Sequence, residues 1–139
     1  MKIMIKNNYT TGLLAKLVED KCVEALEKYQ KDTLSDVTRK APVRTGKLAN
    51  SFKGVLDKRK LESQIGTDVK YAPYVEFGTI EMYDGSYANS LGVSGYAYQF
   101  RQSSRTSGGV SARRFFFSTI RQNFLLMFDD LKRSLNERK

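Results

Sequence analysis

The sequence contains no histidine, a single cysteine (Cys22) and no apolar run long enough to cross a membrane. Without histidine the commonest general base is missing, and a zinc site of the Cys/His type is impossible. One cysteine cannot form an internal disulfide, so a reducing compartment fits best. Residues 1–8 include no apolar stretch of signal-peptide length. We therefore expect a soluble, cytoplasmic protein that holds no metal ion or other cofactor and does not enter a membrane.

Patterns of catalytic residues are also missing. Residues 45–47 (TGK) resemble the end of a phosphate-binding loop, but no glycine precedes them at the required distance, and Leu48 replaces the Ser or Thr that binds magnesium. A metal-dependent nuclease needs only clustered acids. The central acids show no tight pairing, however: Asp68, Glu76, Glu81 and Asp84. We predict that the protein is not an enzyme, and a metal-dependent nuclease is the alternative.

The net charge of +9 is unevenly distributed. Residues 39–60 contain eight Lys or Arg against Asp57, residues 61–100 have a net charge of −4, and residues 101–139 a net charge of +6. Two basic segments thus flank an acidic one. This alternation is typical of contact with a polyanion, and equally of head-to-tail contact between copies whose basic and acidic faces meet.

Hydrophobic periodicity predicts two long helices. Apolar residues recur at three- and four-residue spacing over 12–38, up to the break that Pro42 imposes, and again over 119–136, where Ser118 is the expected N-cap. Cys22 lies on the first apolar stripe, which favours a buried hydrophobic role over a reactive thiol.

Between these helices the pattern changes. Two short runs, 48–56 and 61–69, predict a β-hairpin over 46–69, and Pro73 and Gly78 are placed to begin and end a short helix. Residues 78–111 are rich in Gly, Ser and Tyr, which indicates a long loop excursion. Within it we expect a strand at 96–100, a partner near 82–87 and a mobile tip at 103–109. The whole chain, 1–139, is then one α+β domain, with long N- and C-terminal helices on a small antiparallel sheet.

Three segments admit more than one function. The basic turn 39–47 suits phosphate binding, or a solvated helix end whose cations complement the helix dipole. The tyrosines of the excursion suit stacking on bases, with protein contact favoured. The run 115–117 (FFF) favours core or subunit packing over a membrane wedge.

Three segments taken together resemble the neck protein family of tailed phages: 41–51 (APVRTGKLANS), 65–79 (IGTDVKYAPYVEFGT) and 112–116 (ARRFF). Arg114 stands where the family has proline, and Ser118-Thr119 where it has Pro-Ala. The family positions in this chain are Pro42, Thr45, Gly46, Leu48, Ser51, Gly66, Tyr71, Ala72, Tyr74, Glu76, Phe77, Gly78, Thr79, Arg113 and Phe115.

The resemblance implies a structural virion protein of the neck, which acts in head-tail joining or tail completion. Copies are expected to form a ring through whose lumen genomic DNA passes without sequence recognition. Expected partners are other neck, connector, tail-tube and tail-terminator proteins, with assembly in the host cytoplasm. Candidate DNA-facing or subunit contacts are Arg39, Lys40, Arg44, Lys47, Arg101 and Arg105. The alternative is a basic nucleic-acid-binding module that forms no ring.

Glu76 has two open interpretations. It lies among aromatic residues, so if it is buried it needs a partner, for which a basic residue near Arg44 or Arg113 is the candidate. An ordinary surface acid is the other interpretation.

Overall fold

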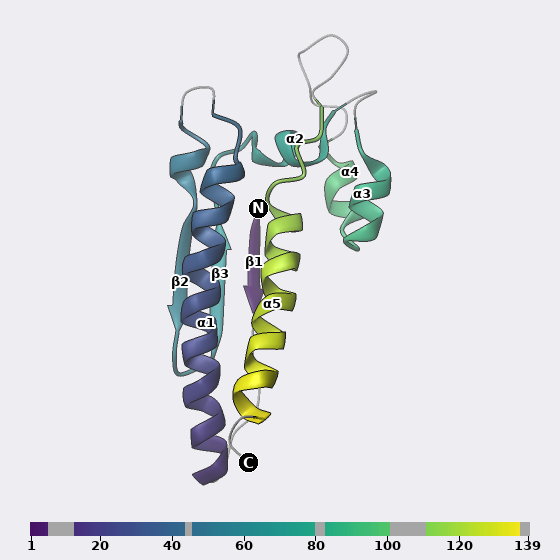
Figure 1. Ribbon diagram of the computed structural model, residues 1–139. Helices are drawn as coiled ribbons and strands as arrows, with labels where there is room; N and C mark the ends of the chain where they lie inside the picture. Colours follow the sequence, from purple (N-terminus) through teal and green to yellow (C-terminus); the bar gives the residue numbers. More distant parts are fainter. Residues whose placement is uncertain (6–12, 44–45, 80–82, 101–110, 137–139) are drawn as a thin grey trace.

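The computed structural model describes residues 1–5, 13–43, 46–79, 83–100 and 111–136. Two long helices, α1 (Leu13–Lys40) and α5 (Phe117–Asn136), form one layer over a small antiparallel sheet (Figure 1). Three short helices, α2 to α4, lie at one end of the molecule near the start of α5. This is the α+β arrangement that the sequence predicts.

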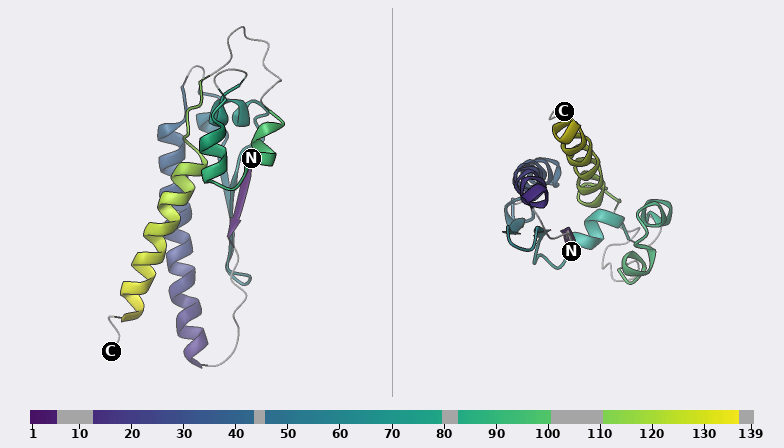
Figure 2. Two further views of the ribbon diagram at one scale, coloured as in Figure 1. Left: turned by 90° about the vertical axis from the view of Figure 1, so that its right-hand side faces the viewer. Right: turned by 90° about the horizontal axis from the view of Figure 1, so that it is seen from below.

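The first long helix buries one side along most of its length. Its buried residues recur at three- and four-residue spacing: Cys22, Leu26, Tyr29, Thr33 and Val37. Such a stripe gives a helix one face for packing, and here that face meets the sheet and α5 (Figure 2). The amide of Ala41 still bonds to the carbonyl of Val37 at 2.9 Å, and Pro42 then prevents continuation.

The last helix runs antiparallel to α1, and the contact between the two helices combines polar and apolar side chains. Asn123 Nδ2 donates to Thr33 Oγ1 at 3.1 Å, and Lys28 Nζ lies 3.5 Å from Asp130 Oδ2. Partly buried Met127 packs against two groups of buried residues, a large one that includes Tyr29 and Ile120 and a small one formed by Cys22, Leu26 and Leu61. Only one side of α5 is therefore occupied by α1.

The sheet contains three strands in the order β1-β3-β2: β1 (Lys2–Ile5), β2 (Lys53–Asp57) and β3 (Glu62–Gly66). The predicted hairpin is present but shorter than 46–69, because Ala49–Ser51 form a 3₁₀ turn in place of the start of a strand. At the hairpin turn, Asp57 Oδ1 accepts the amides of Arg59 and Lys60 at 3.0 and 3.1 Å. This local side-chain bonding ends β2.

Strand β1 is an element that the sequence did not predict. It pairs antiparallel with β3, so that Ile3 lies opposite Ile65 and Lys2 opposite Gly66. A Cβ atom at Gly66 would lie 2.7 Å from the carbonyl oxygen of Met1, so only glycine allows this approach. Four residues are too short a segment for periodicity to identify.

The central segment differs from prediction. Helix α2 (Ala72–Phe77) is confirmed, with Pro73 in its first turn and Gly78, at φ 77°, donating to the carbonyl of Tyr74 at 2.9 Å. The predicted strand at 96–100 is wrong, because α4 (Ser94–Tyr98) occupies that segment and α3 (Gly85–Ser90) precedes it. Asp84 caps α3 by accepting the amide of Tyr87 at 2.9 Å. The predicted tip at 103–109 lies outside the described residues.

Candidate assembly site at the junction of α2 and α5

Three segments that are far apart in the sequence meet beside α2. The turn before β2 is joined to the loop after β3 by the hydroxyls of Ser51 and Thr67, which lie 2.6 Å apart. The ring of Phe52 stacks on Phe116 at 5.5 Å and meets Phe115 edge-on at 5.8 Å. These contacts bring all three family-like motifs into one junction.

The centre of the junction is the fully buried side chain of Glu76. Its Oε2 accepts the amides of Phe115 and Phe116 at 2.9 and 2.8 Å, and its Oε1 accepts the amide of Phe117 at 2.9 Å. The Tyr87 hydroxyl donates to Oε1 at 2.6 Å. Four donors thus surround two oxygens, which is the environment of a carboxylate. A negative group at the N-terminus of α5 also complements the helix dipole.

Backbone hydrogen bonds also join the C-terminal end of α2 to the segment before α5. The last carbonyls of α2 lack partners within their helix. Here Val75 O accepts the amide of Arg113 at 2.8 Å, and Glu76 O accepts the amide of Arg114 at 3.2 Å. Each helix end therefore satisfies the polar groups of the other, and the direction of α5 is fixed by α2.

The hydroxyl of Tyr87 connects α3 to the same site. It accepts the amide of Ser118 at 3.0 Å while it donates to Glu76. Burial raises the pKa of the Tyr87 hydroxyl well above its usual value, and the negative charge and hydrogen bond of Glu76 raise it further. Tyr87 is therefore a neutral donor over a wide pH range.

The cation of the junction is Arg114. Its guanidinium bonds to Asp84, with Nε 2.8 Å from Oδ2, and lies 5.3 Å from the centre of the Tyr87 ring. The amide of Tyr87 and, after it, the guanidinium of Arg114 hold the pKa of Asp84 below its usual value. Arg114 itself has φ 49°, a left-handed conformation that proline cannot adopt.

Two predictions about this junction are wrong. In the part of the chain that the structure describes, Glu76 pairs with no basic side chain: Arg113 is exposed and contributes its amide to Val75, while Arg44 lies outside that part. The amides at a helix start satisfy the buried carboxylate instead. Ser118 is not the N-cap of α5, because the helix begins at Phe117 and the Ser118 hydroxyl donates to the carbonyl of Arg114.

The other motif positions mostly support the junction. Fully or largely buried are Leu48, Ala72, Phe77, Thr79 and Phe115. The ring of Phe77 stacks on the ring of Phe117, with the ring centres 5.6 Å apart, and so adds apolar packing next to Glu76. Tyr74 is half-buried against Phe100 at 5.3 Å, whereas Tyr71 is exposed. Pro42 and Gly46 lie at the turn after α1, and Thr45 lies outside the described residues.

Residues 10–78, about half of the chain, match the model of a family described as "Bacteriophage HK97-gp10, putative tail-component". The chain belongs to this HK97-gp10-like family. The match covers α1, the hairpin and α2, and thus includes Glu76 but not the amides that bind it. No curated protein and no solved structure matches the chain significantly. A phage tail component is a structural protein of the virion that contacts other tail or neck proteins.

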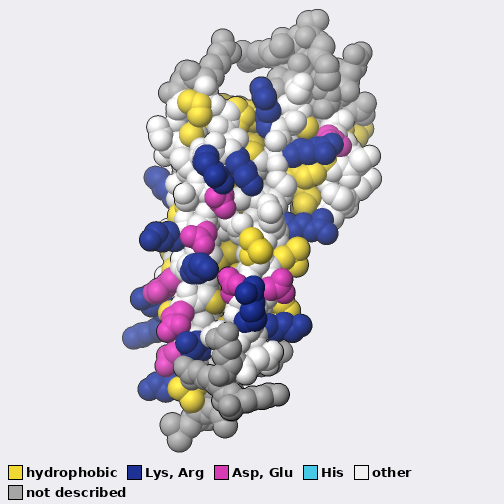
Figure 3. Space-filling model, viewed as in Figure 1, with side chains coloured by type: hydrophobic (Ala, Val, Ile, Leu, Met, Phe, Trp, Pro, Cys, Tyr) yellow, Lys and Arg dark blue, Asp and Glu magenta, His cyan; other side chains and the backbone are white. Residues whose placement is uncertain are grey.

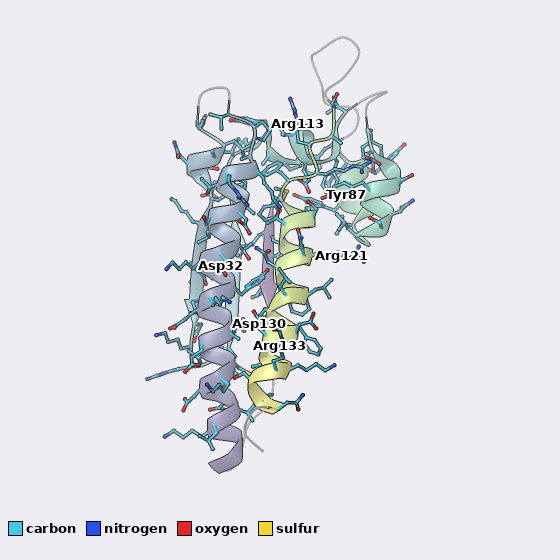
Figure 4. All side chains as sticks on the ribbon, in the orientation of Figure 1. Asp32, Tyr87, Arg113, Arg121, Asp130 and Arg133 are labelled. Atoms are coloured by element: carbon cyan, nitrogen blue, oxygen red, sulfur yellow. The ribbon has the colours of Figure 1, made fainter. Side chains whose placement is uncertain are left out.

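In this HK97-gp10-like protein the described candidate cations gather near the junction. Arg39, Lys40 and Lys47 are exposed at the end of α1 and the turn after it, and Figure 4 shows Arg113 at the same end of the molecule. Arg39 also lies 2.9 Å from Asp36 Oδ1. Arg44, Arg101 and Arg105 lie outside the described residues. Within the described part of the chain, no three acidic or cysteine side chains are grouped as metal ligands require, and no helix is long and apolar enough to span a membrane.

Sequence reasoning missed Asp84, Tyr87 and Arg114 as members of the site. Nothing in their local pattern distinguishes them, because their roles depend on contacts between residues far apart in the sequence. Asp84 bonds to Arg114, 30 residues later, and Tyr87 bonds to Ser118, 31 residues later. The one available signal was an acid among aromatics at Glu76, which indicated that a partner was needed without identifying it.

Proposed function

We propose that the protein is a ring-forming component of the neck of a tailed phage, a head-tail connector or tail completion protein. The observation that carries this proposal is the match of residues 10–78 to a phage tail-component family. The junction at Glu76 supports it, because a ring subunit must hold its contact surfaces in fixed directions. Its partners are further copies of itself and the neighbouring neck, connector, tail-tube or terminator proteins.

The shape of the subunit suits a ring of head-to-tail contacts. One side of the molecule presents α1 and β2, and the other presents α5 and β1 (Figure 1). Among the described residues, β1 and β2 each pair only with β3, so both edges of the sheet are available. Contacts between two different sides, repeated around an axis, close into a ring.

The exposed cations fit a role at the lumen of such a ring. Arg39, Lys40, Lys47 and Arg113 lie at one end of the molecule, where a repeated arrangement would give a belt of positive charge. Charge of this kind attracts DNA phosphates without reading sequence. The proposal places assembly in the host cytoplasm and the finished ring at the head-tail interface.

Native mass measurement tests the proposal. The purified protein is measured alone and after mixing with the neighbouring neck and tail-tube proteins of the same phage. A closed homo-oligomer in either sample supports the ring. A monomer under every condition contradicts it.

The same cluster of cations supports a second candidate, a nucleic-acid-binding module that forms no ring. A salt titration separates the two functions. Binding through several phosphate contacts weakens by orders of magnitude between about 50 and 200 mM salt. Tight, steeply salt-dependent DNA binding by a monomer favours the module, whereas weak DNA affinity together with a high assembled mass favours the ring.

A further inference from the structure

One side of α5 carries an apolar strip that nothing in the described chain covers. Asn123, Met127 and Asp130 face α1. Phe124, Phe128 and Leu135 are spaced by four and seven residues, so they share a different side of the helix. All three are exposed, Phe128 to 51 %. Leu125 flanks them, and together these four residues form the α5 strip.

The strip continues into a groove of about 780 Å³ between α5, β1 and the α3–α4 pair. The groove is lined mainly by apolar side chains, among them Ile3, Leu91, Val93, Ile120 and Phe124. Its rim carries Lys2 and Arg121, and Arg121 also donates to the carbonyl of Ser90 at 3.3 Å. Figure 4 shows Arg121 on the side of α5 that faces α3.

The exposed apolar area of the α5 strip and the groove is comparable to the central part of a stable protein–protein interface. Four half-exposed Phe and Leu side chains leave roughly 400 Å² of apolar area, which already matches the largest patch on a typical monomer. The groove adds to this area. A stable interface buries roughly 800 Å² on each partner, and its centre is the apolar part. The α5 strip and the groove therefore suffice for the centre of a stable contact.

The rim is mainly cationic, with exposed Asp129 next to Phe128 as an acid beside the strip. Lys2 and Arg121 border the groove, and Lys132 lies 5.9 Å from the centre of the Phe128 ring. In Figure 3 apolar side chains reach the surface over α5, with both Asp or Glu and Lys or Arg side chains beside them. A matching occupant combines apolar side chains with acids.

The side of α1 that faces away from α5 offers such a combination. Asp20, Glu24 and Glu27 follow one another on successive turns, with exposed Lys16 and Lys31 at the two ends of the row. Glu27 Oε1 lies 2.7 Å from Lys58 Nζ of the hairpin turn, which places the row on the β2 side. Leu17, one heptad before Glu24, is also exposed. Head-to-tail addition of a copy brings this side of its α1 next to the α5 strip, because both helices lie on the same face of the sheet.

We propose that the α5 strip and the adjoining groove are covered by a second copy of this chain, through the side of its α1 that carries Asp20 and Glu24. This inference rests on the proposed ring and assigns the surfaces that form it. In the assembly, α5 is then flanked by its own α1 and by the α1 of the next subunit.

The test compares variants of neighbouring, equally exposed residues. Phe128→Glu places a charge in the strip. Leu126→Glu is the control, because Leu126 is 55 % exposed but lies on nearly the opposite side of α5 from Phe128, nearer Asp130. Phe128→Glu is expected to raise the concentration for half-assembly by roughly 100-fold, as for a central interface residue. Leu126→Glu leaves it unchanged. Asp20→Lys, which breaks no ion pair found among the described residues, weakens assembly by roughly tenfold at low salt.

Assembly is followed by native mass measurement over a concentration series, with unfolding of each monomer by circular dichroism as a check on folding. Assembly of Phe128→Glu at the wild-type concentration overturns the inference. So does a Phe128→Glu homo-oligomer that has lost only its binding to a tail protein, since the occupant is then another protein. A wild-type chain that never forms a homo-oligomer contradicts the proposed function itself, which is a different result.

Discussion

Replacing Glu76 with glutamine keeps the shape of the side chain and removes one acceptor oxygen. The four donors at 2.6–2.9 Å then meet one oxygen and one NH₂ group. The least costly placement directs the NH₂ toward Tyr87, whose hydroxyl can turn and accept from it. The amide of Phe117 is left without an acceptor, and the remaining bonds lose their charge assistance.

The change in the free energy of unfolding follows from these lost hydrogen bonds. One buried amide without a partner costs about 1–3 kcal/mol, and loss of charge from the other bonds adds a similar amount. Relief of carboxylate burial offsets part of the total. We expect Glu76→Gln to lower the free energy of unfolding by about 3 kcal/mol, a large part of the roughly 5–15 kcal/mol of a typical domain.

Urea unfolding followed by circular dichroism at 222 nm measures this change. Asp32→Asn is the control, because Asp32 is an exposed acid that lies outside both the junction and the surfaces proposed for assembly. It should change stability by less than about 0.5 kcal/mol. Tyr87→Phe should cost about 1–2 kcal/mol and be non-additive with Glu76→Gln. A Glu76→Gln protein as stable as the control variant would show that the buried network has no net stabilising effect.

Three further changes test the geometry around the junction and the sheet. Arg114→Pro should lower stability by about 3 kcal/mol or more in thermal unfolding, because proline cannot adopt φ 49° and lacks the donated amide; an unchanged midpoint would contradict the left-handed conformation. Gly66→Ala should cost about 1–3 kcal/mol by pushing β1 away, while Gly95→Ala, with open space around its Cβ position, should be neutral or slightly stabilising; equal effects would contradict the close approach of β1. The pKa of Asp84 is lower in the folded chain, so the unfolded chain takes up the proton first as the pH falls. The stability difference between wild type and Asp84→Asn should thus shrink below about pH 4, and a difference independent of pH would contradict the ionised pair.

The long helices were predictable because each carries a strong periodic stripe. The apolar stripe that ends near Val37, together with Pro42, predicted the C-terminal end of α1 at residue 38, two residues before the observed end at Lys40. Helix α2 was equally clear from Pro73 and Gly78, which have well-defined positional preferences. These signals are local, so no knowledge of tertiary contacts was needed.

The central segment was mistaken for a physical reason. The alternation Tyr96-Ala97-Tyr98 fits a strand, but in the structure Ala97 is buried within α4 and its amide bonds to the carbonyl of Val93 at 2.9 Å. Tertiary packing overrides a short alternating pattern of this kind. Strand β1 was missed for the related reason that its pairing with β3 is non-local.

The site was only half visible in the sequence. Glu76 among aromatics indicated a buried acid that required partners, but a charged partner was expected where backbone amides are used. The amides of residues 115–117 leave no trace in composition, since every residue except proline carries one. The contribution of Tyr87 likewise depends on α3, which the sequence did not reveal.

Electron microscopy of the assembled protein shows directly whether the subunits close into a ring. We predict closed rings of uniform size with a central opening wide enough for duplex DNA, formed by the protein alone or on its tail partner. Particles that are monomeric, or open filaments without a closed ring, would contradict it.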